Sequence, residues 1–139
     1  MFEYIFNWCL YVLFFYICLP SPYNSVTIIF NLVSLTHALI TIIFSLYIIL
    51  NDDFILDNYD YDKMWIIKIS SAYFIYDSVF MILNNFSMMF FLHHLLILAV
   101  YYITITNDYG TKLVIYTLFW GEITNPLQIS WFLSRYLNY

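Results

Sequence analysis

Two adjacent histidines, His93 and His94, stand inside an otherwise apolar run that extends from Met88 to Thr106. Ionisable residues are expensive in a bilayer, about 2.5–3.5 kcal/mol for an Asp at the centre of a spanning helix, and those that occur there usually mark an internal site. Ionisable residues also stand inside three other apolar runs, as His37, Asp77 and Glu122. The pattern predicts a membrane protein with a polar interior.

The paired histidines have the side chain best suited to proton transfer. A neutral imidazole both donates and accepts, so His93 or His94 could serve as a general base or a nucleophile. Successive residues of a helix lie about 100° apart, so the two rings are not expected to point at one spot. One could face a cavity while the other bonds a neighbouring helix.

The second and third apolar runs carry polar residues at helical spacing. Ser34, His37 and Thr41 share one helix face, where Ser and Thr can also bond their own backbone. For His37, a structural bond to a neighbouring helix and a functional role both stay open. A polar stripe in the third run favours a site, with a structural Asp–His bond as the alternative, and it consists of Ser70, Tyr73, Asp77 and Asn84.

Glu122 and Asn125 stand three residues apart in the fifth run, directly before Pro126. The proline frees a backbone carbonyl near Glu122 and adds polar groups at that depth; bonding between helices is the alternative role. Three histidines and two carboxylates could bind iron or zinc. Histidine-rich membrane oxygenases need many more histidines, however, so we predict no metal site.

Composition bounds the class of protein. Of 139 residues, 64% are hydrophobic and 9% charged, whereas soluble domains carry about 25% charged residues. The bilayer must therefore surround most of the chain, and we expect one domain over residues 1–139. Only four residues are Lys or Arg, which excludes a nucleic-acid interface. The acidic stretch 51–62 is predicted to be a solvated loop.

Five apolar runs predict five membrane helices, because unpaired strands cannot span a bilayer. The expected fold is an all-α, multi-pass transmembrane helical bundle. The sequence has no internal repeat, which argues against a transporter. The first run lacks a preceding positive region and is expected to be a retained helix, not a signal peptide. Gly121 and Pro126 predict a kink in the fifth. The runs are Tyr4 to Leu19, Val26 to Leu50, Met64 to Leu83, Met88 to Thr106, and Leu113 to about Leu133.

Taken in order, the polar motifs resemble the TLC-domain family, which includes ceramide synthases and translocon-associated proteins. The matching pieces span residues 30–135 and are Ser34-Leu35-Thr36-His37-Ala38, Ser71-Ala72-Tyr73 through Asp77, His93-His94, and Glu122-Ile123-Thr124-Asn125-Pro126. The resemblance implies helices around a lipid-facing cavity, usually in the endoplasmic reticulum or, for a viral protein, a host endomembrane. Scarce Gly, Ala, Pro and Arg suggest an AT-rich genome, such as that of a protist or giant virus.

In the ceramide synthases the paired histidines are required for acyl transfer from acyl-CoA to a sphingoid base. The resemblance thus makes His93 and His94 catalytic candidates and Asp77 a supporting residue, with acyl-CoA as a substrate and no bound cofactor. Substrate-binding candidates are His37, Tyr73, Glu122 and Asn125. The expected partners are membrane lipids.

The Glu-x-Thr-Asn-Pro element is more similar to the non-synthase branch, which is linked to phospholipid composition. Nothing in the chain matches the His-Asp element and further Asp that follow the pair in the synthases. The family usually continues with more helices, so the domain is expected to be short at its C-terminal end. Two hypotheses remain: a protein that acts on or senses membrane lipid, with acyl transfer through the histidines, and a non-catalytic protein that binds a lipid or a partner helix.

Overall fold

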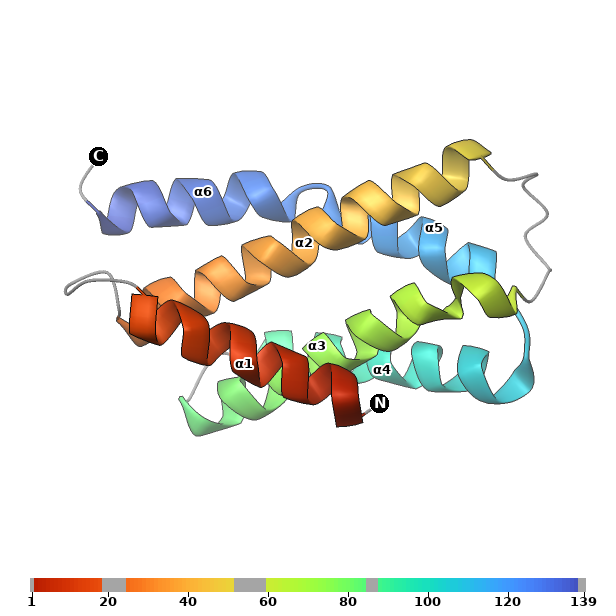
Figure 1. The fold of residues 1–139 in the computed structure, drawn as a ribbon, viewed down its shortest axis with the longest axis horizontal. Helices are drawn as coiled ribbons and strands as arrows, with labels where there is room; N and C mark the ends of the chain where they lie inside the picture. Colours follow the sequence, from red (N-terminus) through yellow and green to blue (C-terminus); the bar gives the residue numbers. More distant parts are fainter. Residues whose placement is uncertain (1, 19–24, 52–59, 85–87, 138–139) are drawn as a thin grey trace.

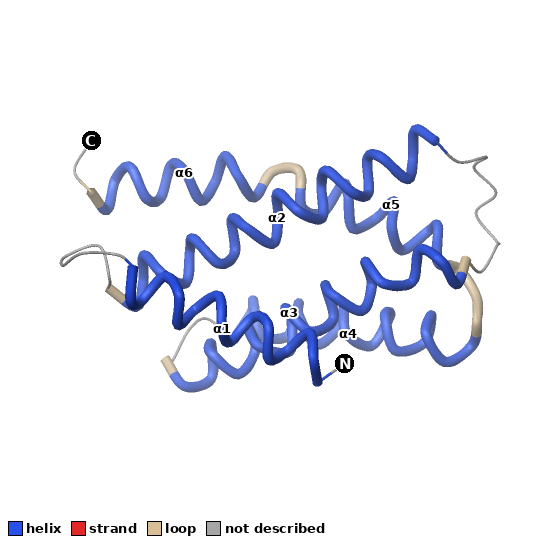
Figure 2. Tube along the Cα trace, in the orientation of Figure 1, coloured by secondary structure: helices blue, strands red, loops and turns tan. Residues whose placement is uncertain are grey.

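The computed structural model describes residues 2–18, 25–51, 60–84 and 88–137, and within these ranges every regular element is helical (Figure 2). The all-α class is confirmed. The described residues form six α-helices, labelled in Figure 1, and one short 3-10 helix. They are α1 (Phe2–Cys18), α2 (Val26–Asn51), η1 (Tyr61–Lys63), α3 (Met64–Leu83), α4 (Met88–Asn107), α5 (Thr111–Glu122) and α6 (Asn125–Tyr136).

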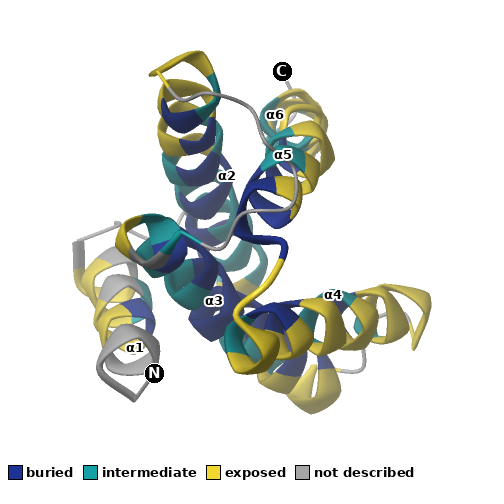
Figure 3. Ribbon diagram, turned by 90° about the vertical axis from the view of Figure 1, so that its right-hand side faces the viewer, coloured by how far each residue is buried: buried dark blue, intermediate teal, exposed yellow. Residues whose placement is uncertain are grey.

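Helix α3 is the centre of the bundle. It packs against α1, α2, α4 and α5, and the end-on view in Figure 3 shows it between α1 and α4 with α2 and α5 on a third side. In its most apolar stretch 56% of α3 is buried, compared with 17% for α4. The stripe of polar residues on α3 therefore lies where helices from three directions can reach it.

Helix α2 lies beside α5 and α6 (Figure 1). Three of its small side chains, Ala38, Thr41 and Ser45, are completely buried. Small residues let helix backbones approach closely, which matters in a bilayer because lipid is as apolar as the side chains and gives no hydrophobic drive to association. The Thr41 hydroxyl donates to the backbone carbonyls of His37 and Ala38, so its burial leaves no polar hydrogen unsatisfied.

The fifth predicted helix is broken into two. Helix α5 ends at Glu122 and α6 begins at Asn125, with Pro126 in its first turn. Proline has no N–H to give the preceding turn but fits a helix start, where that N–H would be unsatisfied. The predicted kink is thus a complete break, and each half has 12 residues, about 18 Å by helix geometry.

Within the described ranges, three helices are long and apolar enough to cross a membrane, namely α2, α3 and α4. The sequence predicts five membrane segments; α5 and α6, with 12 residues each, are shorter than a full span, and α1, with 17 residues, is at the lower limit of one. Large apolar side chains such as Leu96 and Tyr102 are exposed on α4, as a bilayer requires.

The acidic stretch 51–62 is predicted to be solvated, but Asp60 near its end makes contacts with other residues. Asp60 pairs with Lys63, with 2.6 Å between Oδ2 and Nζ, and its backbone N–H donates to the Thr111 hydroxyl. Asp60, near the end of this stretch, is therefore held against the start of α5. Asp62 is exposed as expected, while Asp52, Asp53 and Asp57 lie outside the described residues.

Candidate functional site

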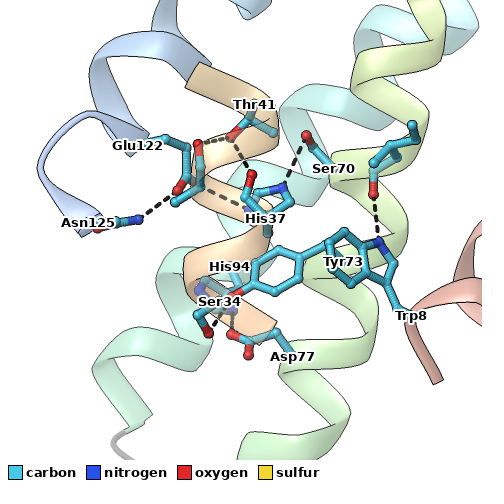
Figure 4. A network of polar contacts seen from close by, with 12 residues as sticks. Trp8, Ser34, His37, Thr41, Ser70, Tyr73, Asp77, His94, Glu122 and Asn125 are labelled. Carbon is cyan, nitrogen blue, oxygen red and sulfur yellow. Dashed lines mark hydrogen bonds and ion pairs between the residues drawn. The ribbon is translucent and has the colours of Figure 1, made fainter. Parts of the chain in front are cut away.

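Polar side chains from five helices meet inside the bundle and contain two imidazole–carboxyl pairs (Figure 4). One pair joins Asp77 of α3 to His94 of α4. The other brings His37 of α2 near Glu122 of α5. The first pair links two consecutive helices, and the second links two helices that are distant in sequence.

In the Asp77–His94 pair, Nδ1 of the imidazole lies 3.1 Å from Oδ2 of the carboxyl group. Asp77 is 1% exposed and His94 8%. Nδ1 and Oδ2 are within ion-pair distance, although Nδ1 makes no hydrogen bond of good geometry among the described residues. When the ring carries its proton on Nδ1, beside the carboxyl group, Nε2 is left as a proton acceptor. Among the described residues Nε2 has no hydrogen-bond partner, so its acceptor capacity is available to a ligand.

In the His37–Glu122 pair the imidazole is enclosed on every side. His37 has no exposed surface; its Nε2 lies 3.2 Å from the Ser70 hydroxyl and its Nδ1 3.8 Å from Oε1 of Glu122. Its ring stacks on Tyr73, with the ring centroids 3.8 Å apart. The packing leaves no face of this ring open to a ligand.

Tyr73 and Asn125 connect these pairs to their surroundings. The Tyr73 hydroxyl donates to Ser34 of α2 at 2.9 Å. The Asn125 side-chain amide donates to Oε2 of Glu122 at 2.7 Å, across the break between α5 and α6. These contacts fix the Tyr73 ring and the Glu122 carboxyl group in place.

Helix α1 closes the back of the site with Trp8. This indole lies edge-on to His37 and Tyr73, and its N–H donates to the backbone carbonyl of Ile69. Residue spacing does not single out Trp8, which stands in an apolar run. The one property that could have indicated a polar contact is its indole N–H, because a buried N–H needs an acceptor.

A cavity of about 570 Å³ lies between α3, α4 and α5. Its wall includes Phe90, Leu96 and Val100 of α4, each at least half exposed, so the cavity is continuous with the lipid-facing surface. Its polar lining consists of Tyr73, His93, His94, Tyr101, Thr117, Glu122 and Asn125. An apolar wall with a few polar groups is the usual form of a ligand site.

Five of the seven predicted site residues line this cavity, and His37 and Asp77 lie behind it in contact with lining residues. Both His93 and His94 face the cavity, with ring centroids 5.9 Å apart, because the cavity is wide enough to reach two successive helix positions. His94 also contacts a neighbouring helix through Asp77. This one residue therefore both faces the cavity and contacts another helix, although we expected one histidine for each role. His93 is exposed.

Comparison with known families gives the class of protein. The TLC domain matches residues 27–139, and the chain belongs to this family. Together with the three long apolar helices, this makes it an integral membrane protein of a lipid-related family. No curated protein and no solved structure matches the chain. Helix α1 precedes the matched region, yet it supplies Trp8 to the site.

Proposed function

We propose that the chain binds a membrane lipid in this cavity and catalyses transfer of an acyl group to it, with His94 as general base. The observation that carries the proposal is the 3.1 Å contact between Asp77 and His94 in the wall of a cavity open to the lipid-facing surface. A carboxylate that orients an imidazole toward a substrate is a recurring arrangement for activating hydroxyl groups.

In the proposed reaction, Nε2 of His94 takes the proton from a hydroxyl group of the acceptor lipid. The hydroxyl oxygen then attacks the carbonyl carbon of acyl-CoA, and the carbon–sulfur bond breaks. The imidazolium returns its proton to the departing thiolate, so the histidine is regenerated. Asp77 keeps the imidazole in the correct tautomer and stabilises its charged form.

The other residues of the site have supporting roles in this proposal. His93 lies beside His94 on the cavity wall, where its ring can donate to the carbonyl oxygen under attack. Tyr73, Glu122 and Asn125 contact the acceptor lipid, and His37 supports Glu122 from behind. We place the reaction in the endoplasmic reticulum or a host endomembrane, as the family resemblance suggests.

The test supplies membranes that contain the protein with acyl-CoA whose acyl chain carries a heavy isotope. Mass spectrometry then measures labelled lipid per amount of protein. Replacing His94 by Ala should lower the labelled product about 10²–10⁴-fold, the usual contribution of a general base. The control is Leu95→Ala, since Leu95 is exposed on the same helix and does not line the cavity. Equal labelling in wild type and His94→Ala would contradict the proposal.

A second candidate is a non-catalytic protein that binds a lipid or a partner helix. It is favoured by side-chain bonds that join helices, such as Tyr73 to Ser34 and His37 to Ser70. If this candidate is correct, wild type forms no labelled lipid, and His94→Ala acts only by lowering the amount of protein.

A further inference from the structure

The polar end of the cavity has carboxyl and imidazole groups but no cation of fixed charge. In the described part of the chain its titratable lining residues are two tyrosines together with His93, His94 and Glu122, and neither Lys nor Arg contributes. Asp77 stands directly behind His94. A phosphate group at this depth would therefore meet carboxyl groups and lack the Lys or Arg that usually binds it.

Glu122 is held in a defined orientation at this end. It is 6% exposed, its Oε2 accepts from the Asn125 amide at 2.7 Å, and its Oε1 lies 3.8 Å from Nδ1 of His37. Figure 4 shows these partners on opposite sides of the carboxyl group. Because one partner comes from α2 and the other from beyond the α5–α6 break, the fold fixes this group from two directions.

We propose that the cavity selects lipids whose polar end is uncharged and donates a hydrogen bond, as a hydroxyl group does, over lipids that carry a phosphate there. Glu122 is the selecting residue, and Asn125 is the residue that positions it. The inference rests on the proposed function, because it names the class of acceptor lipid.

Hydrogen-bond accounting supports this selection. A hydroxyl group that leaves water needs a new acceptor, and a fixed carboxyl group supplies one. A phosphate group would lose its hydration without gaining a cation, a cost that a buried charge recovers only through paired partners. The Asn125 amide keeps the Glu122 carboxyl group in place from the far side of the break between α5 and α6.

The experiment uses the full chain in phosphatidylcholine nanodiscs that contain trace amounts of two photoactivatable probes. One is diacylglycerol, and the other is phosphatidic acid with the same acyl chains. Mass spectrometry measures the ratio of the two probes crosslinked to cavity-lining peptides of α4 and α5. Wild type should favour diacylglycerol by about tenfold, the difference expected from one well-made hydrogen bond and one unpaired charge avoided.

Glu122→Gln keeps the shape of the side chain and an acceptor for Asn125 but removes the carboxyl group. It should lower the ratio of diacylglycerol to phosphatidic acid severalfold but leave it above one, because the amide is a weaker acceptor than a carboxylate while the lining still has no Lys or Arg. Asn125→Ala should lower the ratio by a smaller factor, because the carboxyl group remains but is held on one side only. The control is Gln128→Ala, an exposed amide on α6 that does not line the cavity and should leave the ratio unchanged.

The ratio is internal to each sample, so a variant that folds poorly loses both probes together and keeps its selectivity. An equal ratio in wild type and Glu122→Gln would overturn the role of Glu122, and preferred capture of phosphatidic acid by wild type would overturn the selection itself. Absence of both probes from cavity peptides would contradict lipid binding as well. Failure of acyl transfer with an intact ratio would contradict only the proposed reaction.

Discussion

The two imidazole–carboxyl pairs have similar chemistry but different surroundings. His37 has no exposed surface, stacks on Tyr73 and has a neighbour at each ring nitrogen. His94 contacts Asp77 through one nitrogen and lines the cavity. The same residue type thus secures the bundle in one place and faces a ligand space in the other. The difference shows that access, more than residue identity, separates a structural histidine from a candidate catalytic one.

The largest expected effect on stability is that of His37→Ala. Removing a buried aromatic side chain leaves a cavity and typically costs 3–5 kcal/mol, so we expect a loss of about 3 kcal/mol in the free energy of unfolding. His94→Ala should cost about 1 kcal/mol, since its site already opens onto a cavity. Denaturant titration in detergent micelles measures both. Equal losses would remove the distinction between the two histidines.

A change in Asp77 sharpens the comparison at the accessible pair. Asp77→Asn keeps the size of the side chain but removes the charge that orients and stabilises the imidazole. The labelled-lipid assay should show transfer reduced about 10–100-fold, less than for His94→Ala. Asp62→Asn is the control, because Asp62 is exposed in η1. Unchanged transfer in Asp77→Asn would show that this carboxyl group is structural only.

A smaller effect is expected for the contact that holds Tyr73. Ser34→Ala removes the acceptor of the Tyr73 hydroxyl, and side-chain hydrogen bonds within membranes contribute about 0.6 kcal/mol on average. Thermal unfolding should show a loss of this size, with transfer close to wild type. A complete loss of transfer would mean that Ser34 acts in the reaction.

The smallest effect is expected at the aqueous end of the bundle. Asp60 and Lys63 form a partly exposed pair, and such pairs contribute about 0.2–1 kcal/mol. Asp60→Asn should therefore destabilise the protein only slightly, and the effect should shrink in high salt. If Asp60→Asn lost as much free energy of unfolding as His37→Ala, the Asp60–Lys63 pair would be as important for stability as the buried interior.

The sequence predicts the interior well because bilayer energetics leave few choices. An ionisable residue in an apolar helix must find a polar neighbour, so His37, Asp77, His94 and Glu122 could be expected to converge, and the structure places them in two contacting pairs. The pairing itself could not be predicted, because it depends on helix rotation, which packing sets. His37, a substrate-binding candidate by resemblance, lies behind the cavity with no exposed surface.

Two features escaped prediction for other physical reasons. Trp8 belongs to an apolar run in which the hydrogen bond to Ile69 leaves no trace in residue spacing. The complete break between α5 and α6 was anticipated only as a kink, because Pro126 is compatible with either outcome. The bond from Asn125 to Glu122 joins the two helix ends across this break.

The central claim is that His94 meets lipid in the cavity while His37 does not. Nitrogen-15 NMR of the histidine rings in nanodiscs tests it directly, because the chain has only three histidines and single His→Gln variants assign each signal. On addition of diacylglycerol, we expect the Nε2 resonance of His94 to shift while both resonances of His37 stay in place. Shifts at His37 without a shift at His94 would contradict it.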